Sequence, residues 1–414
     1  MDYNLTTFAR YIEKIMSYII VFVLIAFVGT IAEALASRHP HMQRQIYYCT
    51  FFLVALWGVL KYAVGPDIAS YLPFYREIPS PQAALSHLSE SRFEPGFTLF
   101  CSVLHSWGVS FWWMTAIIAV FYYAVVFCLF KRLKAYHTLA LMALVALDYN
   151  LMFAEFRQCL AVTFFYFFIL LLEKKQYVWA IMMALLSCTM HKSAVIILIL
   201  FGLLFLVGKV PVDKRWYILL GVLIIGLILI PLQPLLVKVV ETLPLSASQI
   251  ASAKHHLLVG KPFQRILIVY LASIFCLAYY LAPKEGNARK HWLVWCGIAI
   301  VVCLYPYWFL LNRLRSYFLP FLIIYIANTL YTSERKDQLT KQVYAFVLVL
   351  YTGVLLLGFP AEAKRLKYPT MNISLVTERF KYSQEVLEKR QLDQAELYWT
   401  CDYQEMIKRG EQMR

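Results

Sequence analysis

The chain has 414 residues, of which 61% are hydrophobic and only 15% are charged. Soluble domains are about 45–50% apolar and about 25% charged, so these proportions exclude a soluble globular protein and indicate an integral membrane protein. The 39 lysines and arginines outnumber the 24 acidic residues, which gives a net charge of +15. In a membrane chain the positive-inside rule accounts for most of this excess, and we expect no nucleic-acid partner.

Twelve apolar runs are candidates for membrane-spanning helices, each of which needs about 20 residues to cross the bilayer. They are residues 16–36, 46–63, 110–131, 137–154, 157–173, 177–190, 192–208, 216–236, 265–283, 291–311, 313–331 and 342–359. A further run, 97–107, is too short to span and contains His105, so it predicts a re-entrant or interfacial helix. The predicted fold class is an all-α polytopic membrane protein with about 12 spans.

Basic clusters between these runs predict the orientation. They lie at 38–44, 131–134, 174–175, 209–215, 284–290 and 335–341. If 97–107 does not cross, every cluster falls on one side, and the positive-inside rule makes that side the cytoplasm. Both ends of the chain then lie outside. A membrane domain over 1–360 is predicted to carry two long outer loops, 64–95 and 237–264, and residues 361–414 form a charged helical tail outside the membrane.

Two carboxylates lie on the predicted outer face. Asp67 follows the helix-ending pair Gly65-Pro66. It either caps the next helix, or it accepts a hydrogen bond from a sugar hydroxyl or serves as a base. Glu94 precedes Pro95 and either complements a helix dipole or adds a second carboxylate to an outer site. The sequence alone leaves both alternatives open for each of the two carboxylates.

Basic residues on the outer side are candidates for function, because the positive-inside rule does not explain them. Arg157 either pairs with Glu155 and snorkels or offers a guanidinium fork that matches a diphosphate. His191 and Lys192 interrupt one long apolar stretch. They either form a polar turn, or His191 acts near neutral pH as a base or as a hydrogen-bond donor to phosphate.

Two further outer segments are basic. Arg313 and Arg315 occupy a tight turn and would make, with Arg157, a cationic pocket for a diphosphate. The segment from Lys254 to Arg265 is suited to anionic lipid headgroups. The sequence has no phosphate-cradling glycine-rich loop, no HExxH and no close CxxC pair, so we expect no metal and no nucleotide cofactor.

An ordered set of motifs resembles the EpsG family, which belongs with the Wzy-type polymerases of bacterial exopolysaccharide, capsule and O-antigen synthesis. The motifs are GPDIASY, EPGF, FRQCLA, HKSA, RLRSYF and the late pair Tyr368-Pro369. By position, the family's polar residues match Asp67, Glu94, Arg157, Gln158, His191, Lys192, Arg313 and Arg315. The sequence departs from the family at Lys61, where many members carry an arginine that binds bidentately as lysine does not.

The resemblance implies an all-helical glycosyltransferase with a C-type-like membrane fold in the bacterial inner membrane. Such an enzyme joins oligosaccharide repeat units carried on undecaprenyl diphosphate at the outer face, without metal or nucleotide. The implied partners are this lipid-linked glycan, membrane lipids, a chain-length regulator and a flippase.

Combining the residues with the resemblance gives predicted roles. The arginines and Lys192 would stabilise the anionic leaving group, and His191, then Glu94 or Asp67, would be the base. The stretch 64–78 would form a glycan-binding wall, and its side chains for that role are Tyr71, Tyr75 and Arg76. An O-antigen ligase or a transferase using a lipid-phosphate sugar would share this site. A flippase would instead place polar groups near the bilayer midplane, where this sequence has almost none.

Overall fold

The structure is a computed structural model of the full chain. It describes residues 28–29, 32, 39–59, 67–88, 91, 93–133, 137–148, 151, 155–207, 238, 241–242, 313–321, 323–324, 383, 385–386, 389 and 393. The chain divides into two compact units, one made of Met1–Lys192 with Glu334–Arg414 and the other of Ser193–Ser333. The regular structure in the described residues is helical.

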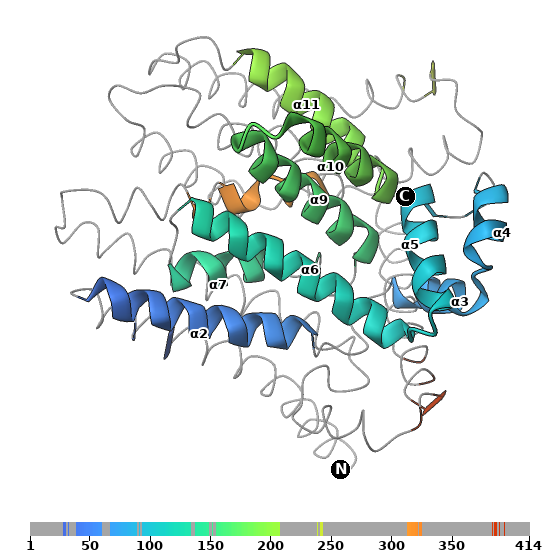
Figure 1. Ribbon diagram of the computed structural model, residues 1–414, viewed down its shortest axis with the longest axis horizontal. Helices are drawn as coiled ribbons and strands as arrows, with labels where there is room; N and C mark the ends of the chain where they lie inside the picture. Colours follow the sequence, from blue (N-terminus) through green and yellow to red (C-terminus); the bar gives the residue numbers. More distant parts are fainter. Residues whose placement is uncertain are drawn as a thin grey trace, which may run out of the picture. The chain divides into compact units, whose positions relative to one another are not determined.

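The first unit contains eight of the described helices (Figure 1). They are α2 (Pro40–Val59), α3 (Ile68–Glu77), α4 (Pro81–Ser86), α5 (Pro95–Ser106), α6 (Phe111–Arg132), α7 (Thr138–Leu147), α9 (Phe156–Glu173) and α10 (Tyr177–Met190). The second unit contains α11 (Ser193–Val207).

The apolar runs predicted between residues 46 and 208 coincide with helices α2, α6, α7, α9, α10 and α11. The short run 97–107 is also helical, as α5. Within the predicted run 137–154, helix α7 ends at Leu147, and Asp148 is its C-cap. Runs 16–36 and 313–331 are described only in part, and 216–236, 265–283, 291–311 and 342–359 lie outside the described residues.

Two of the described helices, α6 and α9, are long and apolar enough to cross a membrane, and α10 and the start of α11 are shorter apolar helices. Several of them expose large apolar side chains. Trp113 on α6 is 65% exposed, and Val178 and Leu185 on α10 are 72% and 62% exposed. Apolar side chains that remain on the surface of a helix are unfavourable in water and favourable in lipid, so these faces are those of a membrane protein.

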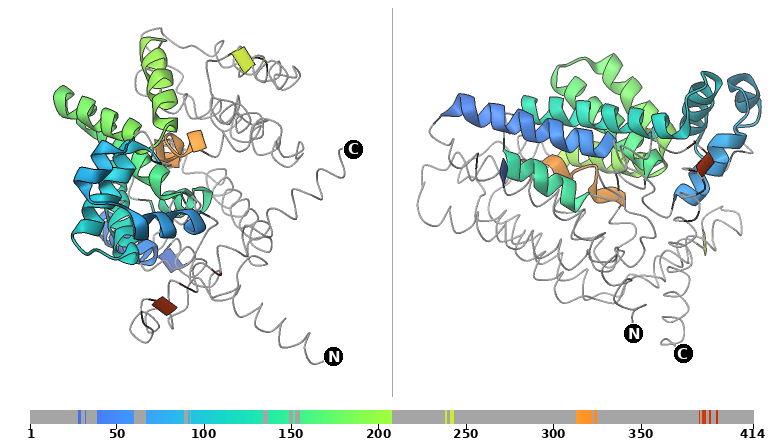
Figure 2. Two further views of the ribbon diagram at one scale, coloured as in Figure 1. Left: turned by 90° about the vertical axis from the view of Figure 1, so that its right-hand side faces the viewer. Right: turned by 90° about the horizontal axis from the view of Figure 1, so that it is seen from below.

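The predicted outer loop 64–95 contains two short helices: α3, which begins directly after Asp67 as one alternative had it, and α4, which the sequence analysis did not anticipate. They gather with α5 beside the first turns of α6 (Figure 1, Figure 2). The Tyr75 hydroxyl donates to the Val109 carbonyl at 2.7 Å, and the Ser102 hydroxyl donates to the Pro79 carbonyl at 2.5 Å. These bonds fasten the segment to α5 and to the loop between α5 and α6, so its side chains are held in place.

Helix α9 lies at the centre of the first unit, packed against both α6 and α10. The Ser187 hydroxyl of α10 donates to the Ala161 carbonyl of α9 at 2.7 Å. At the start of α5, a side chain in place of Gly96 would collide with Thr189 of α10. The absence of a Cβ therefore lets the residues before α5 approach the end of α10.

In the second unit, the first turn of α11 is tied to the segment 313–318. The hydroxyl groups of Ser193 and Tyr317 share a hydrogen bond of 2.9 Å, and both side chains are buried. Buried hydroxyls are stabilised only when they find such a partner. The outer loop 237–264 and the tail 361–414 lie almost wholly outside the described residues, as do Lys61 and the pair Tyr368-Pro369.

Candidate functional site

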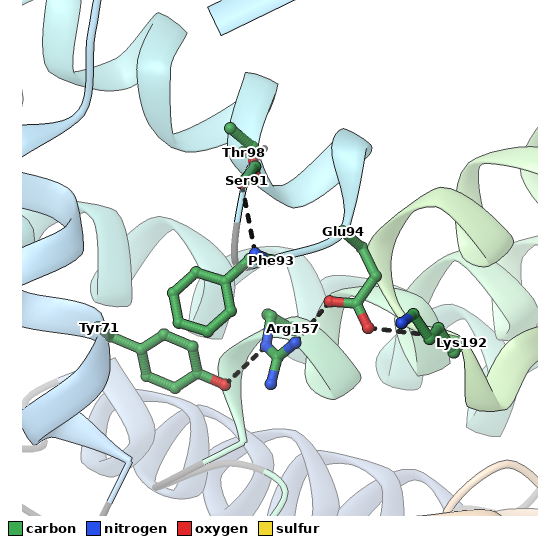
Figure 3. A network of polar contacts seen from close by, with 7 residues as sticks. All are labelled: Tyr71, Ser91, Phe93, Glu94, Thr98, Arg157 and Lys192. Atoms are coloured by element: carbon green, nitrogen blue, oxygen red, sulfur yellow. Dashed lines mark hydrogen bonds and ion pairs between the residues drawn. The ribbon is translucent and has the colours of Figure 1, made fainter. Parts of the chain in front are cut away.

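Arg157, in the first turn of α9, is the centre of a polar network in the first unit (Figure 3). Its Nη1 donates to Glu94 Oε2 at 2.5 Å, across 63 residues of sequence. Its Nε donates to the Tyr71 hydroxyl oxygen at 3.2 Å, across 86 residues. Three segments distant in the sequence thus converge on one guanidinium group.

Aromatic rings hold the flat face of the same guanidinium group. The Arg157 Cζ atom lies 4.5 Å from the Phe93 ring centroid and 5.8 Å from that of Tyr71. The Phe93 and Tyr71 rings contact each other with centroids 5.3 Å apart. A cation over an aromatic face is attracted to it, most strongly where water is excluded. Among the described residues, the Arg157 Nη2 group has no hydrogen-bond partner, so one amino group remains available.

Glu94 is the N-cap residue of α5, and its side chain makes no capping hydrogen bond to that helix. Instead, Oε2 pairs with Arg157 while Oε1 accepts the backbone N–H of Lys192 at 3.4 Å (Figure 3). Burial on its own raises the pKa of the Glu94 carboxyl, but the charges of Arg157 and His191 outweigh it and hold the pKa below its usual value. Glu94 is therefore ionised at neutral pH.

The loop before α5 is shaped by short-range contacts. The Ser91 hydroxyl accepts the backbone N–H of Phe93 at 3.3 Å and shares a 2.8 Å hydrogen bond with Thr98 (Figure 3). Pro95 occupies the first turn of α5, where its missing N–H costs nothing. Phe93 and Glu94 are consequently presented side by side, one to the face of Arg157 and one to its edge.

His191 and Lys192 form the turn between α10 and α11, as the sequence predicted. His191 is the C-cap of α10 and is 7% exposed, whereas the Lys192 side chain is exposed. Both lie beside Glu94 and so close to Arg157. The structure thus brings together four of the predicted site residues: Glu94, Arg157, His191 and Lys192.

Two further predicted site residues, Asp67 and Gln158, each adjoin a member of the network. Asp67 contacts the backbone of Tyr71, and Gln158 follows Arg157 in the sequence. Asp67 is half-buried, and its carbonyl accepts the backbone N–H groups of Ser70 and Tyr71 at the start of α3. Its carboxylate does not cap the helix, so the capping alternative is not what the structure has. Gln158, next to Arg157, is 1% exposed.

The stretch predicted as a glycan wall has a different character from the one expected. Tyr71 and Tyr75 are each 3% exposed, and their hydroxyl groups bond within the protein, one to Arg157 and the other to Val109. Arg76 is exposed. Buried rings cannot offer their faces to a sugar, so the two tyrosines support the site from within, and Arg76 is the member of the wall that solvent reaches.

Arg313 and Arg315 belong to the second unit, where each is partly exposed beside the buried Leu314 and Tyr317. Their predicted role in the same pocket as Arg157 stays a prediction.

Sequence reasoning missed two contributors to the site, Phe93 and the Tyr71 hydroxyl, and it named Glu155 as the local partner of Arg157. Phe93 directly precedes the motif EPGF, and an aromatic residue directly before a candidate carboxylate was the available signal. Within the described residues, no three His, Cys, Asp or Glu side chains gather to hold a metal ion. The available groups, Arg157 Nη2 and the Lys192 ammonium, are suited to an anion.

These features define a helical membrane protein with a partly buried arginine in the first turn of an apolar helix. The chain matches the family model described as "EpsG family" over residues 45–370 and belongs to that family, as its motifs predicted. The family consists of membrane proteins linked to exopolysaccharide biosynthesis. No curated protein and no solved structure matches the chain.

Proposed function

We propose that the protein is a glycosyltransferase that polymerises oligosaccharide repeat units carried on undecaprenyl diphosphate. The observation that carries this proposal is Arg157, an arginine at the end of an apolar helix whose Nη2 group is open among the described residues. An arginine near the membrane is costly and is retained where it has a function. In an exopolysaccharide family, an anionic lipid-linked sugar is the substrate that fits it.

The reaction breaks the bond between the anomeric carbon of the growing glycan and an oxygen of its diphosphate. A hydroxyl group of the incoming repeat unit forms the new glycosidic bond and gives its proton to a base. The electron pair of the broken bond stays with undecaprenyl diphosphate, which leaves. Cations placed where this charge develops lower the barrier, and Arg157 and Lys192 would supply them, with Arg313, Arg315 and Gln158 as further candidates.

His191 is the better candidate for the base than Glu94. The Glu94 carboxylate is bonded to Arg157 and to the Lys192 backbone, and the charge of Arg157 lowers its pKa against the effect of burial. A carboxylate with a lowered pKa takes up a proton less readily. Asp67, which is half-buried at the start of α3, remains the alternative base.

The proposal includes a topology of about 12 spans in a C-type-like fold in the inner membrane. The site would face the periplasm or the exterior, the tail 361–414 would lie on the same side, and a flippase and a chain-length regulator would be partners. The orientation rests on the distribution of basic clusters along the sequence.

Deletion of the gene and electrophoresis of the surface glycan would test this function. The deletion strain is complemented with wild type, Arg157→Ala or Arg313→Ala. The matched control is Arg132→Ala, because Arg132 of α6 pairs with Glu173 at the opposite end of α9. We expect loss of the long ladder, with a single repeat unit still reaching its acceptor, and restoration by wild type and Arg132→Ala only. Failure of even the single unit to reach the surface would indicate a ligase or flippase. Full restoration of the ladder by both Arg157→Ala and Arg313→Ala would contradict the proposed diphosphate pocket.

A further inference from the structure

We propose that Glu94 is an exchangeable partner of Arg157, which yields to the diphosphate on binding and returns to displace undecaprenyl diphosphate after transfer. This inference rests on the proposed function and assigns Glu94 a role that differs from that of a base. Glu94 acts through Arg157 and is therefore a positioning residue.

The first argument is that the Arg157 guanidinium group has uncharged partners on its face and at Nε and a charged partner at Nη1. Its face rests on Phe93 and its Nε donates to Tyr71, and both partners are uncharged and buried. Only Nη1 is bound by an ion, Glu94. A phosphate oxygen can therefore replace the carboxylate oxygen while Phe93 and Tyr71 keep the arginine in position. Such fixed positioning limits the entropy lost on binding.

The second argument is the way in which Glu94 is held. Its two oxygens have separate partners, since Oε2 bonds Arg157 and Oε1 accepts the Lys192 N–H. When the bond to Arg157 is given up, the bond to the backbone N–H of Lys192 remains. The buried carboxylate is thus not left without a partner, which would be costly. It also stays within reach of Arg157 and competes for it continuously.

The third argument comes from the reaction itself. Every addition leaves one carrier diphosphate in the site, and a guanidinium group binds such an anion strongly. Interactions that bind product as tightly as the transition state slow turnover, and product release limits many enzymes. A carboxylate that competes for the same cation weakens binding of the product. The exchange therefore favours release.

The test measures binding of farnesyl diphosphate, a short carrier analogue, to the purified full-length protein in detergent by calorimetry. Farnesol and inorganic diphosphate separate the contributions of the lipid tail and the anion. The variants are Glu94→Gln, which removes the charge and keeps the shape, Arg157→Gln, and the control Glu173→Gln. Glu173 forms the other described Arg–Glu pair, with Arg132, and its exposed position makes it a matched control.

We expect Glu94→Gln to bind farnesyl diphosphate roughly tenfold more tightly than wild type, which is an ordinary size for coupling between competing ligands. Glu173→Gln should bind as wild type does, and Arg157→Gln should lose binding. Damage to the site weakens binding, so a gain in affinity separates competition from a structural role. If Glu94→Gln does not fold, Glu94→Asp, whose shorter side chain reaches Arg157 less well, should give a smaller gain.

Two outcomes overturn the inference in distinguishable ways. Equal or weaker binding by the Glu94 variants, with wild-type binding intact and dependent on Arg157, removes the exchange and leaves the proposed function standing. Binding of farnesol alone by every variant, with no contribution from the diphosphate, removes the diphosphate site and the exchange with it.

Discussion

Helix α9 carries an Arg–Glu ion pair at each end, and the two pairs differ in their surroundings. In its first turn, Arg157 lies 2.5 Å from Glu94, and the side chains are 19% and 7% exposed. Its last residue, Glu173, lies 3.1 Å from Arg132 of α6, and these side chains are 36% and 53% exposed. Both pairs join segments distant in the sequence, yet only the first rests on aromatic rings.

The difference separates a structural contact from a candidate site. An exposed pair contributes about 0–1 kcal/mol to stability, and the basic residue at that end is also what the positive-inside rule predicts. A buried pair must offset a desolvation cost that a hydrophobic replacement would avoid. Stability alone therefore gives no reason for a partly buried Arg157–Glu94 pair, whereas the anion-binding role proposed above would give one.

The largest effect is expected from replacing Arg157 by lysine, with the same replacement of Arg132 as the control. Arg157→Lys keeps the charge but loses the planar group that meets Phe93, Tyr71 and Glu94 at once. We expect polymer formation to fall about 100-fold, comparable to the loss of one donor to a developing negative charge. Arg132→Lys should leave it unchanged. Measurement of glycan formed per unit time in membranes would decide, and equal activity of the two variants would contradict the distinction.

A smaller effect is expected on stability. Glu94→Gln leaves the partly buried Arg157 without its ionic partner and should lower the free energy of unfolding by about 2 kcal/mol, the range for a hydrogen bond to a charged group. Glu173→Gln should cost less than about 1 kcal/mol. Thermal unfolding of both variants in the same detergent measures the difference. Similar losses would mean that the burial of the first pair has no energetic consequence.

A third effect concerns the neutral support of Arg157. Tyr71→Phe removes the hydroxyl that accepts from Nε and keeps the ring packed, so we expect about 1 kcal/mol of lost interaction and roughly fivefold slower polymerisation. In the Arg157→Lys background the same change should have little further effect, because contacting residues are not additive. Independent losses in the double variant would show that Tyr71 acts elsewhere.

The smallest effect is expected from mild acid. Burial raises the pKa of Glu94, but Arg157 and His191 lower it more, so the folded-state pKa lies below the unfolded one. The contribution of the pair is therefore fully present above the unfolded value of about 4.3 and is lost as the pH falls through the folded pKa. The stability difference between wild type and Glu94→Gln should be equal at pH 7 and pH 5 and shrink only in stronger acid. A difference already lost at pH 5 would contradict this assignment.

Much of the helical framework follows from composition. Apolar runs predict α6, α9 and α10 closely, because few alternatives satisfy the backbone within a membrane. The polar turn at 191–192 was predicted for the same reason. Helix α4 was missed, because its short and partly polar sequence shows no periodicity and its helix packs on α5.

The members of the site could be predicted, but not their partners. Arg157 and Glu94 attract attention because charged residues beside apolar runs are rare. Their pairing could not be read from the sequence, since it depends on the approach of α5 to α10 at Gly96. For the same reason, Tyr71 and Tyr75 were assigned to a surface wall, although both lie in the interior. Spacing along the chain carries no information about such contacts between helices.

The length of α9 makes the site sensitive to the bilayer. Its 18 residues extend about 27 Å at the usual rise, slightly less than the roughly 30 Å of an average hydrocarbon core. In a thicker bilayer, hydrophobic mismatch draws such a helix upright and thins the surrounding lipid, and in a thinner one it tilts. Because Arg157 and Glu173 lie in the first and last turns of α9, either response would change the depth of the Arg157 guanidinium group relative to the lipid. Under the proposed function, we expect the acyl-chain length of the host membrane to affect the rate of polymerisation.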